Sequence, residues 1–131
     1  MGKIVIDTSA VMATILDEPE RARLVELSRG ADLLAPGSQR WELGNAFSAL
    51  FRKKRLDLPR ALAAVRVYET IPIQYVDVEL AKALNTADTL GIYAYDAYMI
   101  VCAIDHKAPL LTLDRSLRRR AENLNVAVLE V

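Results

Sequence analysis

The chain has 131 residues, of which 53% are hydrophobic and 26% are charged. Residues 1–131 are therefore expected to form one folded domain with a substantial core, which excludes a disordered or repetitive protein. Seventeen basic residues balance seventeen acidic ones, so the chain has no overall positive field for nucleic acid, and any such binding must come from a local patch.

The single cysteine and the apolar segments indicate where the protein works. Cys102 lies in the apolar run YMIVCAI, and one thiol can form neither an internal disulfide nor a zinc cluster. No segment is long and apolar enough to span a bilayer, and the first strand begins too early for a signal peptide. We therefore expect a cytoplasmic protein with a buried, reduced thiol and no membrane association.

The first part of the chain alternates short apolar runs with helical patterns. Residues 3–7 (KIVID) and 32–36 (DLLAP) are typical of buried strands. Between them, residues 17–29 predict a helix, with Pro19 at its first position and Gly30 as its stop.

The same alternation continues to the end of the chain. The predicted elements are, in order, helix 38–55, helix 59–70, strand 72–78, helix 79–91, helix 94–107, strand 109–114, a basic helix from Arg115, and strand 126–131. Strands that are separated by helices imply a parallel sheet covered on both faces. The predicted fold class is therefore α/β, a three-layer α/β/α domain with a central parallel sheet.

Two acids end buried strands of this predicted sheet. Asp7 ends the first strand and Asp114 follows the strand that begins at Pro109. Because side chains alternate along a strand, Thr112 shares a face with Asp114. The ends of parallel strands lie on one edge, so these polar side chains are expected to meet there.

Two further acids lie near the starts of helices. Asp96 enters the most apolar helix of the sequence, and Glu42 lies in the first turns of helix 38–55, with Asn45 on the same side. Strand ends and helix starts converge in doubly wound folds, which predicts a pocket of carboxylates. Like charges gathered in a pocket repel one another, so such a cluster usually holds a cation, and carboxylate oxygens suit Mg²⁺ or Mn²⁺.

Asp7 also has a purely structural interpretation. Thr8 or Ser9 could cap a helix that begins near Ala10, with Asp7 beside the positive end of that helix. Capping would explain Asp7 alone, but it does not explain four acids that converge.

The segments IVIDTSAV, WELGNAF, YDAYMIVCAI and LLTLD resemble the four acidic motifs of PIN domains in their order and approximate spacing. The similarity is closest to the small VapC-type toxins of bacterial and archaeal toxin–antitoxin pairs. It implies a PIN-like fold, an acidic cluster and a set of supporting polar residues. The cluster is Asp7, Glu42, Asp96 and Asp114, and the support is Thr8, Ser9, Asn45 and Thr112.

A metal ion held by Asp7 and Asp96, with Glu42 and Asp114 near it or holding a second ion, would suit hydrolysis of a phosphodiester. The alternative route to RNA cleavage uses paired side-chain acids and bases, often histidines, and His106 is the only histidine. We therefore expect an Mg²⁺- or Mn²⁺-dependent endoribonuclease that acts on single-stranded or looped RNA.

Local patches must supply the contacts to RNA. Arg115 is the candidate for phosphate contact because it follows Asp114. Tyr93, Tyr95 and Tyr98 could stack on unpaired bases, although their apolar surroundings favour packing in the core.

The similarity to VapC-type toxins also implies a homodimer that is inhibited by a VapB-like antitoxin, whose tail blocks the acidic pocket. Leu24, Phe47 and Phe51 are candidates for an apolar groove that would take such a segment.

Two other classes of protein fit parts of the pattern. One is a PIN-like module that binds RNA or protein without cutting it. The other is a phosphoryl-transfer α/β domain, such as a receiver or haloacid-dehalogenase-like fold, which also ends its first strand on Asp. A dehalogenase-type motif, however, would have a second Asp where Ser9 stands.

Overall fold

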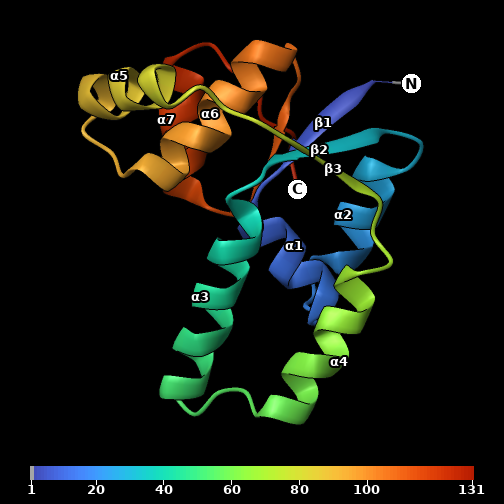
Figure 1. The fold of residues 1–131 in the computed structure, drawn as a ribbon. Helices are drawn as coiled ribbons and strands as arrows, with labels where there is room; N and C mark the ends of the chain where they lie inside the picture. The colour runs from blue at the N-terminus through green and yellow to red at the C-terminus, as the bar shows by residue number, and fades with distance from the viewer. Residues whose placement is uncertain (1) are drawn as a thin grey trace.

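The computed structural model describes residues 2–131 and has a parallel sheet between two groups of helices (Figure 1). The sheet has the order β3-β2-β1-β4. Its strands are β1 (Lys3–Ile6), β2 (Asp32–Pro36), β3 (Ile73–Val76) and β4 (Leu110–Leu111). All pairings are parallel, which confirms the predicted α/β class.

The helices fall into two groups, one on each face of the sheet (Figure 1). They are α1 (Thr8–Ile15), α2 (Arg21–Ser28), α3 (Gln39–Arg52), α4 (Leu58–Tyr68), α5 (Leu80–Leu90), α6 (Ala94–His106) and α7 (Arg115–Asn123). Side chains of β1 alternate between the two faces of the sheet. Ile4 and Ile6 pack in the core under α1–α4, and Val5 packs in the core under α6 and α7. No helix in residues 2–131 has both the length and the apolar character to cross a membrane.

The strand order places a topological switch point between β1 and β4. The chain passes from β1 to β2 to β3 in one direction, and then returns through α5 and α6 to place β4 on the other side of β1. Open α/β sheets bind ligands outside the carboxyl ends of the strands at such a point. Asp7 and Thr112 follow these two strands directly.

The first helix begins earlier than predicted. It starts at Thr8, and Asp7 is its N-cap, with a side chain that accepts a hydrogen bond from the backbone N–H of Ser9 at 3.3 Å. The interpretation of Thr8 or Ser9 as the cap of a helix from Ala10 was therefore wrong. The carboxylate takes the cap position because its oxygen reaches the exposed N–H groups of the first turn.

Other helix boundaries also differ from the predicted ones. α2 begins at Arg21, and Pro19 lies in the turn before it rather than at its first position. α3 ends at Arg52, three residues early, because Lys54 adopts a left-handed conformation with φ 56°. At the end of α5, Gly91 is the predicted stop and has φ 65°, which glycine adopts without strain.

The predicted strand over residues 126–131 does not form. The tail lies beside β4, but it pairs only through one bridge between Val128 and Leu110. A two-residue strand such as β4 offers too short an edge for a full ladder.

The apolar residues assigned to a partner groove are mostly part of the core. Leu24 and Phe47 are buried among the residues of α1–α4, and only Phe51 remains exposed. The prediction that Leu24 and Phe47 are spare was wrong, because the sheet and α1 cover the faces that carry them. Cys102 is buried in α6 as predicted, and burial raises the pKa of its thiol to about 12.

Candidate active site

Asp7 is the buried centre of the acidic edge, with a relative exposure of 6%. Its Oδ2 atom accepts hydrogen bonds from the hydroxyl of Ser9 at 2.6 Å and from the hydroxyl of Thr112 at 2.7 Å. Ser9 belongs to α1 and Thr112 follows β4, so the carboxylate joins the two elements that flank the switch point. A buried carboxylate requires such donors to offset its loss of solvation.

The two hydroxyls are oriented by the backbone. The N–H of Leu113 donates to Ser9 Oγ at 2.9 Å, and the N–H of Asp114 donates to Thr112 Oγ1 at 3.0 Å. Each hydroxyl oxygen thus accepts a hydrogen bond from a backbone N–H and donates its own O–H to Asp7. Within residues 2–131, the hydrogen bonds to the Asp7 carboxylate all reach Oδ2, which leaves Oδ1 for another ligand.

Glu42 approaches Asp7 from the first turn of α3. The hydroxyl of Thr8 donates to its Oε2 atom, while Oε1 is buried and has no hydrogen-bond partner in the described part of the chain. Burial raises the pKa of Glu42 from its usual 4.5 to about 7; the Thr8 hydrogen bond opposes this rise, and the charges of Asp7 and Asp96 add to it.

Asp96 lies in the first turn of α6 and is half-buried. Burial raises its pKa, and the charges of Asp114 and Asp7 raise it further, whereas Arg120 lowers it. The charge of Asp7 thus acts on both Glu42 and Asp96, and that of Asp114 acts on Asp96.

Asp114 has two structural contacts of its own. It is exposed and caps α7, where its Oδ1 atom accepts from the N–H groups of Ser116 and Leu117. It lines a cavity of about 350 Å³ together with Thr112 and Arg115. Arg115 therefore lies beside Asp114 at this cavity, and its contact with a phosphate stays a prediction.

Asn45 and the tyrosines occupy the outer part of this region. Asn45 is exposed on α3, where its backbone carbonyl accepts from Ser48, and its supporting role stays a prediction. Tyr93 is 88% exposed and Tyr95 is also exposed. The interpretation that these two tyrosines pack in the core was wrong, because they precede and begin α6 outside its buried stretch.

Two residues that the sequence analysis did not single out hold the site together. Gln39 is fully buried, and its Nε2 atom donates to the carbonyl of Ile6 at 2.7 Å, which ties the start of α3 to the end of β1. Nothing in the sequence marked this contact. Arg120 donates to the carbonyl of Leu90 at 2.9 Å and lies close enough to Asp96 to affect it. Its position three residues after buried Leu117 placed it on the inner side of α7.

The donor set fits a hard divalent cation. No group of three or more His, Cys, Asp or Glu side chains in residues 2–131 forms a ready-made metal cage. Mg²⁺, however, keeps several waters and needs only one or two carboxylates. Asp7 has its Oδ1 atom left for a ligand, and the unpartnered, buried Oε1 of Glu42 lacks the hydrogen bond that such an oxygen normally has.

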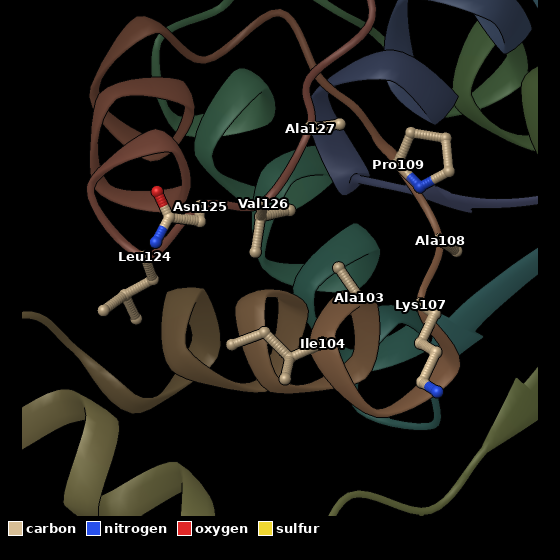
Figure 2. Close-up of a pocket in the computed structure, with 9 residues that line it drawn as sticks. All are labelled: Ala103, Ile104, Lys107, Ala108, Pro109, Leu124, Asn125, Val126 and Ala127. Atoms are coloured by element: carbon tan, nitrogen blue, oxygen red, sulfur yellow. The ribbon is translucent and has the colours of Figure 1, made fainter.

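A different cavity lies at the opposite edge of the sheet. Figure 2 shows this space of about 380 Å³ between the end of α6, the segment before β4 and the turn after α7. Lys107 is the charged residue among the side chains that line it, and the rest are apolar except for Asn125. It contains no carboxylate, so the acidic chemistry belongs to the other edge.

The sheet order and the acidic edge define a three-layer α/β protein with a carboxylate site at its switch point. The model of the PIN domain matches residues 4–123, which is most of the sequence, and the chain therefore belongs to the PIN domain family. This membership disfavours the receiver and dehalogenase alternatives. Comparison with curated proteins finds no match.

Solved structures share the fold. PAE2754 from Pyrobaculum aerophilum aligns with a TM-score of 0.70 and 23% identity, over 93% of this chain and 85% of that one. VapBC2 from Rickettsia felis, bound to a DNA fragment from their promoter, aligns with a TM-score of 0.66 and 17% identity, over 97% of each chain. VapC20 from Mycobacterium tuberculosis, a toxin that cleaves the sarcin-ricin loop, aligns with a TM-score of 0.64 and 15% identity, over 88% of this chain and 93% of that one.

The raised pKa of Glu42 predicts how the metal-free protein responds to pH. The folded state holds the Glu42 proton more tightly than the unfolded state does, so this group lowers stability as pH rises from about 4.5 to about 7. Glu42→Gln removes that loss. We expect the melting temperature of the variant, relative to the original protein, to rise between pH 4.5 and pH 7 when both are measured in EDTA. A difference in melting temperature between the two proteins that stays constant from pH 4.5 to pH 7 would show that the pKa of Glu42 is not raised.

Proposed function

We propose that this protein is a metal-dependent endoribonuclease that hydrolyses phosphodiester bonds in single-stranded or looped RNA, and that it is the toxin of a type II toxin–antitoxin pair. The observation that carries the proposal is the Asp7 carboxylate at the switch point, which two oriented hydroxyls hold and whose charge acts on Glu42 and Asp96. Membership of the PIN domain family supports it. VapC20, which shares the fold, is a toxin that cleaves RNA of the sarcin-ricin loop.

Asp7 and Asp96 are the residues that would hold Mg²⁺ or Mn²⁺. When bound, such an ion would lower the pKa of a water molecule and neutralise charge that develops on the phosphate. Burial is the main cause of the raised pKa of Glu42 and Asp96, and the ion would relieve the further rise that repulsion between the carboxylates adds.

The side chains around the acids have separate tasks in this proposal. Ser9 and Thr112 fix the Asp7 carboxylate so that Oδ1 faces the site. Thr8 holds Oε2 of Glu42, and Oε1 of Glu42 is the oxygen that takes the proton of the attacking water. Arg115, beside Asp114, neutralises a phosphate of the RNA.

A partner protein is part of the proposal. The structure of VapBC2 is that of a toxin–antitoxin pair, which supports a VapB-like antitoxin for this chain, and we also propose that the toxin is a homodimer. An Arg side chain of the antitoxin tail would form charge-assisted hydrogen bonds with Asp7 and Asp96 and would compete with the metal. We expect co-expression with the product of the adjacent gene to give a complex with reduced Mg²⁺ affinity and no RNA cleavage. A complex that still binds Mg²⁺ and cuts RNA would exclude this mode of inhibition.

The direct test is an RNA cleavage assay with analysis of the ends. We expect cleavage of single-stranded RNA in Mg²⁺ or Mn²⁺, no cleavage in EDTA, and products with 5′-phosphate and 3′-hydroxyl ends, because water is the nucleophile. Ends that carry a cyclic phosphate would show that the ribose hydroxyl attacks instead and would exclude the mechanism.

Asp7→Asn separates the roles of Asp7 as ligand and as cap. Cleavage should fall at least about 100-fold, since even residues that only support a metal ligand contribute 10–100-fold. Metal-free stability should stay the same or rise slightly, because Asn also caps helices and the repulsion is removed.

Asp57→Asn is the matched control for this variant. Asp57 caps α4 through the same kind of contact, because its side chain accepts from the N–H of Arg60 at 3.0 Å, and it is not one of the four acids of the proposed site. RNA cleavage by the Asp57→Asn variant should equal that of the original protein. An Asp7→Asn variant as active as the Asp57→Asn control would remove Asp7 from the site.

A further inference from the structure

A cavity of about 420 Å³ lies at the carboxyl ends of β2 and β3. Its walls combine aromatic and apolar side chains with two polar ones. They include Ser38, Trp41, Asp77, Val78, Leu80 and Tyr98. This volume and this mixture are typical of a site for a small organic group.

Trp41 is the most conspicuous wall of this cavity. It is the only tryptophan of the chain and is 69% exposed, whereas its neighbours Leu43 and Phe47 on α3 point into the core. Tyr98 lines the same cavity from α6 and contacts Tyr95 edge-to-face, with ring centroids 6.2 Å apart. An exposed indole beside a phenol offers aromatic surface on which a planar base can stack.

The cavity and the acidic site are built on the same two helices, α3 and α6. Trp41 directly precedes Glu42 on α3, and Tyr98 follows Asp96 by two residues on α6. Both aromatic walls therefore lie in the first turns of the helices that carry Glu42 and Asp96. An RNA whose phosphate is bound at the acids would pass these turns.

The polar groups favour a base that donates hydrogen bonds. The Asp77 carboxylate is exposed at the end of β3 and can only accept when ionised. The Ser38 hydroxyl is buried without a hydrogen-bond partner in residues 2–131. Guanine presents two adjacent N–H donors on its Watson–Crick edge, which match a carboxylate, whereas the other bases place an acceptor beside their donor.

A cation near the carboxyl end of β3 favours a ligand that carries a phosphate over an apolar peptide. Arg40 directly precedes Trp41, and its guanidinium lies 4.7 Å from the ring centroid of Tyr75 on β3.

We propose that the cavity between Trp41 and Tyr98 binds one unpaired guanine of the RNA, adjacent to the phosphate that is cleaved. This inference rests on the proposed ribonuclease function and adds to it a determinant of cleavage position. Trp41 and Tyr98 stack on the base, and Asp77 reads its edge.

The first experiment measures binding without cleavage. Metal-free protein in EDTA is titrated with short single-stranded RNAs that differ at one position, and the fluorescence of Trp41 is recorded. Since Trp41 is the only tryptophan, quenching reports stacking at this cavity. We expect saturable quenching, with tighter binding of guanine-containing RNA than of RNA with adenine, cytosine or uracil there.

The second experiment compares variants by anisotropy of labelled RNA. Trp41→Leu should weaken binding of guanine-containing RNA by about 5- to 100-fold, as loss of base stacking does. Phe51→Leu is the control, since it also replaces a partly exposed aromatic by leucine, about 15 Å further along α3, and should bind as the original protein does.

Two more variants test the edge and the space of the cavity. Asp77→Asn should abolish the preference for guanine. Gly37→Leu should weaken binding, because Gly37 lines the cavity and a Cβ there meets no atom within 4 Å, so the fold has room for a bulky side chain at the cavity wall.

The outcomes separate this inference from the proposed function. RNA cleavage that Trp41→Leu leaves unchanged, in rate and in position, would overturn the base site and keep the nuclease. Quenching by guanine-containing RNA in a protein that cuts no RNA would keep the base site and overturn the nuclease. Trp41 emission that changes with protein concentration alone, with a dimer mass in light scattering, would mean that a second copy covers the cavity and would overturn the proposal.

Discussion

The buried carboxylate of Asp7 is the contact on which the rest of the acidic edge depends. It caps α1 through Ser9, and it accepts the hydroxyls of Ser9 and Thr112, so β1, α1 and the segment after β4 meet at one atom. These donors compensate for the removal of a charge from water, which is costly when a buried carboxylate has no partner. The cap contact uses the same oxygen as the two hydroxyls, so the role of Asp7 as a helix cap does not exclude its proposed role as a metal ligand.

The price of this arrangement is electrostatic. Glu42 and Asp96 are partly buried, and this burial together with the negative charge of Asp7 and of other acids raises the pKa of each. Two contacts oppose these rises in pKa. Thr8 donates a hydrogen bond to Glu42, and the positive charge of Arg120 acts on Asp96. The compensation is incomplete, as the unpartnered Oε1 of Glu42 shows. Sites that retain such unfavourable charge are more often functional than structural.

The two edges of the sheet have different chemical character. The carboxyl edge carries the acids, Arg115 and the aromatic cavity of Trp41 and Tyr98, whereas the cavity at the amino end of β4 is lined mainly by small and apolar side chains (Figure 2). Right-handed crossovers place every strand's carboxyl end at the same edge, beside the starts of the following helices. Phosphate chemistry and base recognition can therefore occupy adjacent places without a second domain.

The sequence by itself determined the α/β class and most elements and pointed to Asp7, Glu42, Asp96 and Asp114 as candidates, because hydrophobic periodicity and strand-terminal polar residues are local signals. It did not determine helix starts, where Asp7 rather than Thr8 or Ser9 took the cap, nor the fate of residues 126–131, which depends on the short edge that β4 offers. Only the tertiary structure decided that Gln39 ties α3 to β1 and that Leu24 is core, while Trp41 stays exposed beside a cavity. These outcomes depend on which helix face the sheet covers, and the relevant neighbours are far apart in the sequence, so no local pattern contains them.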